Sequence, residues 1–440
     1  MANMIADISK YLMILLIAMY TFWNFRYFGV REERRPVLAG RQNRIMYLLH
    51  FLAYAVMFLK TGEEKLLVFY GAQAVFFLCY LFFYRRFYRN HSHILVNNMC
   101  ILLCVGFIIL TRLSFERAVR QFVLVVFSAA VTLVIPFIID RVWQLSRIPW
   151  VYGGLGAGLL GAVYLVGDDS YGAQLSLTVR GISVQPSEFV KIIFVFFVAT
   201  MFYRSTEKRQ VIVTTAAAGI HILILALSKD LGSALIFFAS YVFMLFIATS
   251  DWRYLGGGVI GGALASLAGW ALFSHVRVRV AVWADPWADI DNKGYQITQS
   301  LFAIGTGSWF GMGLYQGMPG KIPVVEKDFV LAAVSEEMGA LFAFCVLLIC
   351  VGCFIQFMMI ACRMDAMFYK LIAVGLASMY IAQVFLTAGG ACKFIPSTGV
   401  TLPFVSYGGS SMMSTFIVFS VIQGMYILKR DEEEEYGTDC

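Results

Sequence analysis

The chain alternates long apolar runs with short polar segments from one end to the other. A helix needs about 18 residues or more to cross the roughly 30 Å hydrocarbon core of a bilayer. Backbone N–H and C=O groups cannot stay unpaired in lipid, so each run that crosses must be helical. The pattern predicts an all-α, polytopic membrane protein with thirteen spans. The predicted spans are 7–25, 45–60, 66–84, 96–113, 118–140, 149–167, 186–203, 211–228, 232–249, 254–273, 329–358, 366–389 and 401–428.

Composition and charge support this class. Hydrophobic residues make up 60% of the chain and charged residues 14%, which is too little charge for the surface of a soluble domain. The net charge of +7 lies in short segments between spans, a pattern that orients membrane proteins and does not resemble a nucleic-acid-binding stripe. We therefore expect membrane lipids and no nucleic acid as partners.

The basic segments set the predicted orientation. Thirteen spans place four of them on one side, which the positive-inside rule makes cytoplasmic. The N-terminus is then outside and the C-terminus inside, in a plasma membrane. Arg112, Arg117 and Arg120 are exceptions, because this topology puts them at an outer boundary. The four basic segments are 26–44, 85–89, 203–209 and 429–430.

The same orientation makes three long polar connections extracellular, at 168–185, 274–328 and 390–400. A loop as long as 274–328 is usually functional or disordered. Its many aromatic residues favour a folded loop at the outer interface. At the other end of the chain, the acidic run 431–435 is expected to be solvated and disordered.

Charged residues at membrane depth are costly, so they are functional candidates. Glu188 and Lys191 stand at i and i+3 and can pair on one helical face. The pair is interpreted either as lining a substrate groove or as a structural ion pair at a helix end.

A second group lies where the large loop meets the next span. Asp328 precedes Ser335, Glu336 and Glu337, and Ser335 and Glu336 would share its helical face about two turns on. A carboxylate at a water–lipid boundary can accept a proton from a sugar hydroxyl as a general base. The alternative for Asp328 is an ordinary helix N-cap.

A third group is the Gly-, Pro- and Ser-rich segment 393–411, which predicts an interrupted helix or a re-entrant turn. Freed amides near Lys393 would suit an anion such as a diphosphate, and close helix packing is the alternative. Ser406 and Ser410 are candidate substrate-binding residues of this segment. Arg279 adds positive charge to the large loop.

These groups, in this order, resemble the SEDS family of shape, elongation, division and sporulation proteins, the FtsW/RodA/SpoVE type. The resemblance covers roughly residues 96–428 and predicts a ten-helix core, residues 1–95 as an extension of about three helices, and 429–440 as an acidic cytoplasmic tail. The motifs that carry it are Gln185-Pro-Ser-Glu188 with Lys191, Asp230-Leu-Gly232, Gly294-Tyr-Gln296, Ala303-Ile-Gly305 with Gly311 and Gly313, Asp328-Phe with Glu336-Glu337 and Gly339, and Pro396-x-x-Gly399 through Leu402-Pro-Phe-Val-Ser-Tyr-Gly-Gly-Ser410.

The resemblance implies a peptidoglycan glycosyltransferase that polymerises lipid II, an undecaprenyl-diphosphate-linked disaccharide pentapeptide, in cell elongation, division or sporulation. It implies a class B penicillin-binding transpeptidase as partner, no organic cofactor, and a divalent cation, Mg²⁺ or Mn²⁺, as the possible assisting ion. The metal ligands are unknown.

By the same resemblance Asp328 is the essential acid, and Glu188 and Lys191 are a functional pair. The expected reaction is an inverting hexosyl transfer in which Asp328 deprotonates the acceptor hydroxyl. Lys191, Arg279, Lys393 or a bound cation would stabilise the departing undecaprenyl diphosphate. Glu336, Ser406 and Ser410 are expected to bind substrate.

Other functions remain open at this point. A lipid II flippase would explain the charged residues but predicts charge on both faces of the membrane. A noncatalytic scaffold for a transpeptidase would leave Asp328 dispensable. Another lipid-linked sugar enzyme, such as an O-antigen polymerase or ligase, would share the large loop without these motifs.

Overall fold

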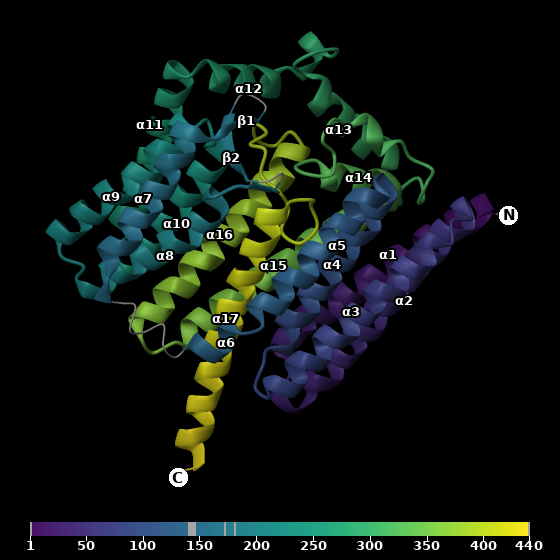
Figure 1. The fold of residues 1–440 in the computed structure, drawn as a ribbon, viewed down its shortest axis with the longest axis horizontal. Coiled ribbons are helices and arrows are strands. Elements are labelled where there is room, and N and C mark those ends of the chain that lie inside the picture. The colour runs from purple at the N-terminus through teal and green to yellow at the C-terminus, as the bar shows by residue number, and fades with distance from the viewer. Residues whose placement is uncertain (1, 140–146, 171–172, 180–181, 439–440) are drawn as a thin grey trace. The chain divides into compact units, whose positions relative to one another are not determined.

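Twelve helices in the described part of the chain are long and apolar enough to cross a membrane (Figure 1). The structure is a computed structural model, and it describes residues 2–139, 147–170, 173–179 and 182–438. The remaining predicted span, 186–203, corresponds to α8 (Ser187–Arg204), whose 18 residues carry charges at Glu188, Lys191 and Arg204. The protein is an all-α, multi-pass membrane protein, as its hydrophobic pattern predicts.

The helices form two units. The first comprises Met1–Leu133, Val282–Cys353 and Val384–Gly408, and the second Val134–Ala281, Phe354–Gln383 and Gly409–Cys440. At three points the chain passes from one unit to the other within a helix. These helices are α12 (Ser274–Ala284), α15 (Ala340–Arg363) and α16 (Met367–Ala391).

The first unit is built around α4 (His93–Leu113), whose apolar stretch is buried along its full length. A helix that is apolar all round has no face for solvent, and here neighbouring helices cover it. In Figure 1 the N-terminal helices run beside α4 and α5 (Phe115–Thr132). The other elements of this unit are α1 (Ala2–Arg26), η1 (Tyr27–Gly29), η2 (Glu32–Arg34), α2 (Arg35–Thr61), α3 (Lys65–Phe87), η4 (Pro286–Asp289), α13 (Tyr295–Gly307), η5 (Pro319–Lys321) and α14 (Val330–Met338).

The predicted span 329–358 is wrong as a single helix. It is divided into α14 and α15 at Gly339, which has φ +96° and ψ 157°. Only glycine adopts such a conformation readily, so the helix must break at this residue. The average hydrophobicity of a segment cannot reveal a helix break that depends on the backbone angles of a single residue.

The loop 307–313 satisfies the hydrogen-bonding groups that this break exposes. The amides of Ala340 and Leu341, the first of α15, donate to the carbonyls of Ser308 and Trp309 at 2.9 and 3.2 Å. The last carbonyls of α14 accept from Met312 and Gly313, each at 2.8 Å. Helix ends leave such groups unpaired, so the large loop is part of the fold at α14.

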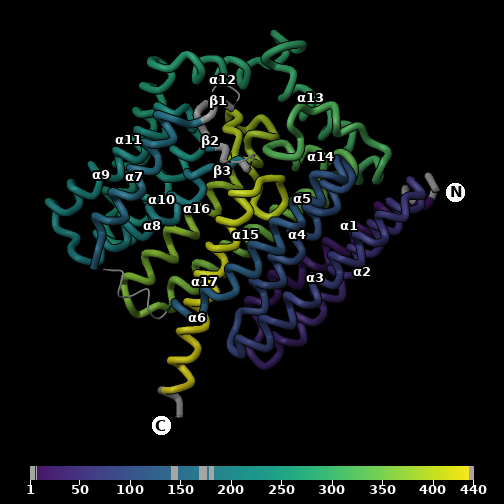
Figure 2. Tube along the Cα trace, viewed as in Figure 1, coloured from purple at the N-terminus to yellow at the C-terminus, as the bar shows by residue number. Residues whose placement is uncertain are grey.

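The loop 274–328 is folded, as predicted. It contains α12, η4, α13 and η5, which together account for much of its length. The segment 392–408 is irregular, which confirms the predicted helix interruption (Figure 2). It contacts α4 where Gly106 has no side chain: a Cβ at Gly106 would lie 2.7 Å from the Phe404 carbonyl oxygen.

The second unit holds most of the remaining helices. Contacts among α7, α8, α9 and α10 form its centre, and α17 packs on α6 and α8. Its elements besides α8, α12, α15 and α16 are α6 (Ile135–Ile138), α7 (Pro149–Val166), α9 (Lys208–Leu227), α10 (Leu231–Thr249), α11 (Trp252–Leu272), α17 (Gly409–Thr438) and the strands β1 (Asp168–Ser170), β2 (Ala173–Val179) and β3 (Ile182–Val184).

Two features of this unit differ from expectation. The connection 168–185 contains an antiparallel sheet of order β1-β2-β3, which the sequence pattern did not predict. The acidic run 431–435 continues α17, which reaches Thr438, so the prediction of disorder there is wrong. Asp140, the predicted end of the fifth span, lies outside the described residues.

Candidate functional site

Asp328 lies in a turn directly before α14 and is half-buried. The N-cap position of α14 belongs to Phe329, which is fully buried, so Asp328 is not the N-cap and is not on the helix itself. Glu336 and Ser335 do lie on the helix, and both are buried. The carboxylate of Asp328 is thus attached to the start of a short, buried helix.

The turn that carries Asp328 is tied to α5 and to the irregular segment. Arg117 forms an ion pair with the buried Glu326 carboxylate, and the backbone amide of Tyr407 donates to the Glu326 carbonyl at 2.7 Å. The Ser406 hydroxyl donates to the Lys327 carbonyl and accepts from the Leu402 amide at 2.9 Å. The two residues before Asp328 are therefore fixed on both sides.

Gln121 of α5 completes this arrangement. Its amide nitrogen donates to the Ser406 carbonyl at 3.3 Å, and its amide oxygen accepts from the Gly408 backbone at 3.3 Å. Gln121 is 1% exposed. Buried polar groups are stable only when hydrogen-bonded, and here the partners are the backbone of the predicted substrate segment.

Arg112 and Glu337 form a buried ion pair between α4 and α14. Arg112 Nε donates to Glu337 Oε1 at 2.8 Å, and its Nη2 donates to the Gly317 carbonyl at 3.2 Å. The guanidinium also lies 4.3 Å from the centre of the Tyr315 ring. Burial raises the pKa of Glu337 to about 7, while Arg112 acts in the opposite direction.

Each of the three arginines that depart from the predicted charge pattern pairs with a glutamate. Arg112 pairs with Glu337, Arg117 with Glu326 and Arg120 with Glu116.

Glu336 is 7% exposed, and its Oε1 accepts from the Met318 amide at 2.7 Å. Its Oε2 has no hydrogen-bond partner among the described residues. Lys393, at φ +58°, is half-buried in the irregular segment, and its ammonium lies 3.4 Å from the Ala284 carbonyl. The Lys393 carbonyl accepts from the Trp283 indole at 3.1 Å, so the large loop contacts the irregular segment here.

The second unit holds the other predicted charged pair. Lys191 Nζ lies 2.5 Å from Glu188 Oε2 and donates to Gln383 Oε1 at 3.0 Å, which confirms the predicted pairing. The Ser414 hydroxyl donates to the same Glu188 oxygen at 2.8 Å. Three helices, α8, α16 and α17, therefore meet at this ion pair.

Gln185 and Ser187, just before this pair in the chain, form hydrogen bonds to the ends of α10 and α17. Ser410 Oγ accepts from the Gln185 amide at 3.0 Å. Asp230 caps α10 by accepting from Ser233, and it also accepts from the Ser187 hydroxyl at 3.2 Å. Burial raises the pKa of Asp230.

Arg279 lies half-buried in α12 in the part of that helix that belongs to the second unit. The pKa of the nearby His275 is lowered by burial and by the charges of Arg279 and Lys229. Cationic groups therefore gather at this end of the unit, in agreement with the predicted positive charge of the loop.

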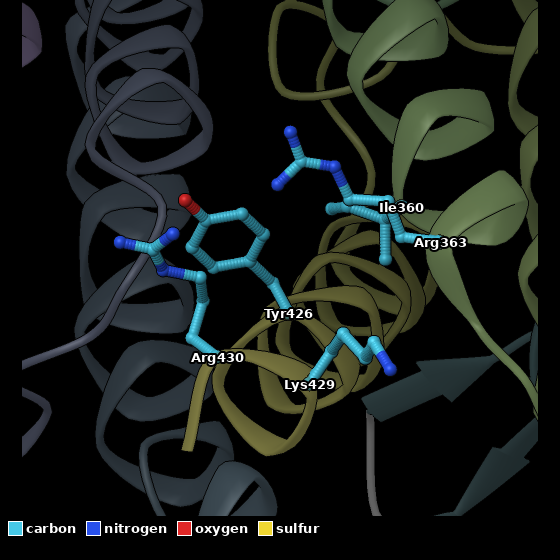
Figure 3. Close-up of a pocket in the computed structure, with 5 residues that line it drawn as sticks. All are labelled: Ile360, Arg363, Tyr426, Lys429 and Arg430. Carbon is cyan, nitrogen blue, oxygen red and sulfur yellow. The ribbon is translucent and has the colours of Figure 1, made fainter. Parts of the chain in front are cut away.

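The opposite end of α17 carries a shallow hollow lined by Ile360, Arg363, Tyr426, Lys429 and Arg430. Figure 3 shows the Tyr426 ring between the two arginine side chains. Lys429 is paired with Asp365 at 2.5 Å, and it lies about 28 Å along the helix from Ser410 at 1.5 Å per residue. This hollow is not close to the predicted site residues of the same helix.

The predicted site residues thus divide into two sets. Asp328, Glu336, Lys393 and Ser406 belong to the first unit, and Glu188, Lys191, Arg279 and Ser410 to the second. The sequence analysis missed Arg112, Arg117, Gln121, Gln383 and Ser414 as partners of these residues. An available signal was that Arg112 and Glu337 lie in predicted spans, where each charge would need a partner.

The expected divalent cation stays a prediction. Within residues 2–139, 147–170, 173–179 and 182–438, no three His, Cys, Asp or Glu side chains group in a way that could hold a metal ion. Metal sites in proteins usually combine several such ligands. Within these described residues, no such group of side chains is formed without a contribution from substrate.

Comparison with known proteins assigns the chain to a family. A family model described as "Cell cycle protein", of the FtsW, RodA and SpoVE type, matches residues 93–430. A Mycobacterium bovis protein named peptidoglycan glycosyltransferase RodA is 33% identical over 313 residues, 67% of this chain and 66% of the relative. The chain thus spans just under two thirds of that relative.

Other relatives have related names. The peptidoglycan glycosyltransferase RodA of Mycobacterium leprae is 29% identical over 426 residues, which cover 88% of this chain and 90% of that protein. A Neisseria gonorrhoeae protein named probable peptidoglycan glycosyltransferase FtsW is 29% identical over 342 residues, 67% of this chain and 71% of that protein.

Solved structures share the fold. A chain from a structure on the coordination of polymerization and crosslinking by a peptidoglycan synthase complex has a TM-score of 0.65 and 23% identity, covering 78% of this chain and 98% of that chain. The rod shape determining protein RodA of Thermus thermophilus has a TM-score of 0.59 and 22% identity, covering 78% and 97%. The chain belongs to the FtsW, RodA and SpoVE family of cell cycle proteins.

Proposed function

We propose that the protein is a peptidoglycan glycosyltransferase that polymerises lipid II into glycan strands at the outer face of a bacterial plasma membrane. The names of its relatives support the reaction class. The observation that carries the proposal is the placement of Asp328, a half-buried carboxylate between a doubly anchored turn and the buried helix α14.

Asp328 acts as the general base in this proposal. Its carboxylate accepts the proton of the acceptor sugar's 4-hydroxyl while that oxygen attacks the anomeric carbon of the donor. The bond from this carbon to the diphosphate oxygen breaks, the configuration inverts, and undecaprenyl diphosphate leaves with the bonding electron pair. A base that is held within hydrogen-bond reach of the hydroxyl lowers the barrier to this step.

Positive charge is needed where the diphosphate departs. Our candidates for this positive charge are Arg279, which is half-buried in the large loop, and Lys393, which is half-buried in the irregular segment. Lys191 is already engaged by Glu188 and Gln383, so its contribution is to hold α8, α16 and α17 together.

The remaining assignments complete the proposal. Glu336, Ser406 and Ser410 help to shape the substrate-binding surfaces, and the outer location requires the N-terminus outside and the C-terminus in the cytoplasm. A class B penicillin-binding transpeptidase is the proposed partner. A structural neighbour from a peptidoglycan synthase complex supports that choice.

The experiment is a polymerisation assay with purified protein and labelled lipid II, with and without the transpeptidase. Wild-type protein should form glycan chains, and Asp328→Ala and Asp328→Asn should not. Asp291→Asn, which neutralises an exposed acid of the same loop, is the matched control and should retain activity.

The rivals give different results in the same system. A flippase would move lipid II across vesicle membranes without lengthening glycans. A scaffold would leave polymerisation unaffected by Asp328→Asn whenever a second polymerase supplies the activity. Glycan synthesis by Asp328→Asn at the wild-type rate, with no other polymerase present, would rule out the proposed base.

A further inference from the structure

We propose that the N-terminal helices α1, α2 and α3 are a positioning element that holds Arg112 and the 311–318 segment against α14. These helices precede the region that the family model matches, which begins at residue 93. The inference rests on the proposed function, because α14 matters through the Asp328 carboxylate at its start.

The first turns of α1 contact the 311–318 segment directly. Lys10 Nζ donates to the Gly311 carbonyl at 3.0 Å, and Gln316 Nε2 donates to Asp7 Oδ1 at 3.0 Å. Asp7 and Lys10 are three residues apart and so share a face of the helix. The Tyr11 ring also lies 5.6 Å from the Phe310 ring.

The 311–318 segment in turn forms the surroundings of the two glutamates of α14. The Met318 amide donates to the Glu336 carboxylate at 2.7 Å, and the Met312 amide donates to the Glu336 carbonyl at 2.8 Å. The Gly317 carbonyl accepts from Arg112 at 3.2 Å. A displacement of this segment would therefore remove hydrogen bonds from Glu336 and from Arg112, the partner of Glu337.

A second connection reaches Arg112 from α2 and α3. His50 and Gln73 are 2.8 Å apart, Gln73 donates to the Tyr54 hydroxyl at 2.8 Å, and that hydroxyl lies 2.9 Å from Thr111 Oγ1. All four side chains are buried, and Thr111 directly precedes Arg112.

The hydrogen-bond directions in this chain are largely determined. Gln73 donates its amide hydrogen to Tyr54, so the Tyr54 hydroxyl hydrogen is available for Thr111. A buried, connected polar network favours one arrangement of its members, because leaving any of them unpaired is costly. The network thus fixes the end of α4 at which Arg112 meets Glu337.

Both connections act on the same short helix. α14 has nine residues between Asp328 on one side and the Gly339 break on the other. A short helix moves as a rigid body. A loss of contacts at Glu336 and Glu337 would therefore also move Asp328, which precedes α14. Catalysis is sensitive to this, because a shift of about 1 Å can lower a rate by about a hundredfold.

The test compares Lys10→Ala and Tyr54→Phe with wild-type protein in the lipid II assay. Tyr54→Phe keeps the ring and removes only the hydroxyl. We expect kcat to fall about tenfold in each variant, with KM near the wild-type value, because alignment and not substrate contact is lost. Lys10→Arg should restore activity, because it keeps a charged donor.

Tyr80→Phe is the matched control. Tyr80 is a buried tyrosine of α3 whose hydroxyl lies 3.9 Å from the Met99 sulfur. Its described contacts are with Met99, Phe76 and Tyr84, so the kcat of Tyr80→Phe should equal that of wild type. An equal loss in Tyr80→Phe would show that the helices contribute only general stability.

Amide hydrogen exchange supplies a readout that does not need activity. Lys10→Ala should exchange faster over 311–318 and 326–338, while α8 in the second unit stays as in wild type. Unchanged exchange together with unchanged kcat in both variants would overturn the positioning role. If wild type forms no glycan, the proposed function fails, and the exchange measurement alone then decides this inference.

Discussion

The guanidinium Nε of Arg112 donates to Glu337 Oε1 across 2.8 Å and joins α4 to α14. The carboxylate side chain is fully buried, and that of the arginine is 19% exposed. Neither charge is stable at this position without the other, because an isolated buried ion loses its hydration with no compensation. The pair therefore fixes the helix that follows Asp328.

Arg112→Leu should destabilise the protein strongly. It leaves the Glu337 carboxylate buried and unpaired, which costs about 3–5 kcal/mol when one partner of a buried pair is removed. The measurement is thermal unfolding in detergent at pH 8, where the wild-type carboxylate is charged. The double variant Arg112→Leu/Glu337→Gln should recover much of the loss, and equal stability of the two variants would contradict the pairing.

The pH dependence of stability should contain a contribution from Glu337. Burial raises its pKa from 4.5 to about 7 in the folded protein, so between these values the folded state binds more protons than the unfolded state. Stability that is fully present below pH 4.5 is then lost as the pH rises through 7. Thermal unfolding across this window should show the decline in wild type and a flatter profile in Glu337→Gln.

The helical spans are the best-predicted part of the fold. The predicted spans 149–167 and 232–249 match α7 and α10 to within one residue. The predicted span 401–428 begins too early, because α17 starts at Gly409. The hydrophobic pattern shows which residues are stable in lipid, but it does not show their backbone conformation. A residue in irregular backbone can be as apolar as one in a helix.

The sequence predicted which residues belong to the candidate site, but it predicted only some of the contacts between them. The i, i+3 spacing of Glu188 and Lys191 gave their pairing correctly, because both lie on one helix. The pairing of Arg117 with Glu326 joins residues more than 200 positions apart. Such a contact depends on the packing of α5 against the large loop, about which local patterns carry no information.

The Lys191–Glu188 pair gives a further prediction. Lys191→Met removes the cation next to a carboxylate whose side chain is 13% exposed, and it should cost about 3–5 kcal/mol. Lys191→Met/Glu188→Gln removes that uncompensated charge and keeps an amide oxygen that can accept from Ser414, so it should be more stable than the single variant. Chemical unfolding of both proteins checks this. Activity that recovers along with stability would favour the structural interpretation of the pair over the substrate groove.

Gly311 and Gly399 form a matched comparison, because both have φ +76°. A Cβ at Gly311 would lie 2.4 Å from the Glu337 carbonyl oxygen, whereas a Cβ at Gly399 meets nothing within 4 Å. Alanine at either position carries a conformational cost of about 1–2 kcal/mol. Gly311→Ala adds a backbone clash, so it should lose markedly more thermal stability and more polymerisation activity than Gly399→Ala. Similar losses in the two variants would mean that the 311–318 segment can shift to relieve the clash without disturbing α14.

Ser406 and Ser410 should differ although both are predicted to bind substrate. Ser406 is 3% exposed and makes two hydrogen bonds to the backbone, one of them to the Lys327 carbonyl next to Asp328. Ser406→Ala removes both bonds and takes the acceptor from the amide of the buried Leu402, at a cost of about 1–3 kcal/mol.

Ser410 is half-exposed and accepts one bond from the Gln185 amide, which water can replace. Thermal unfolding should therefore show a clear loss for Ser406→Ala and little change for Ser410→Ala. In the polymerisation assay Ser406→Ala should lower kcat, because the Asp328 turn loses one of its anchors. Full kcat with reduced stability would mean that Arg117 and Tyr407 suffice to hold Asp328, and the role of Ser406 would then be confined to the fold.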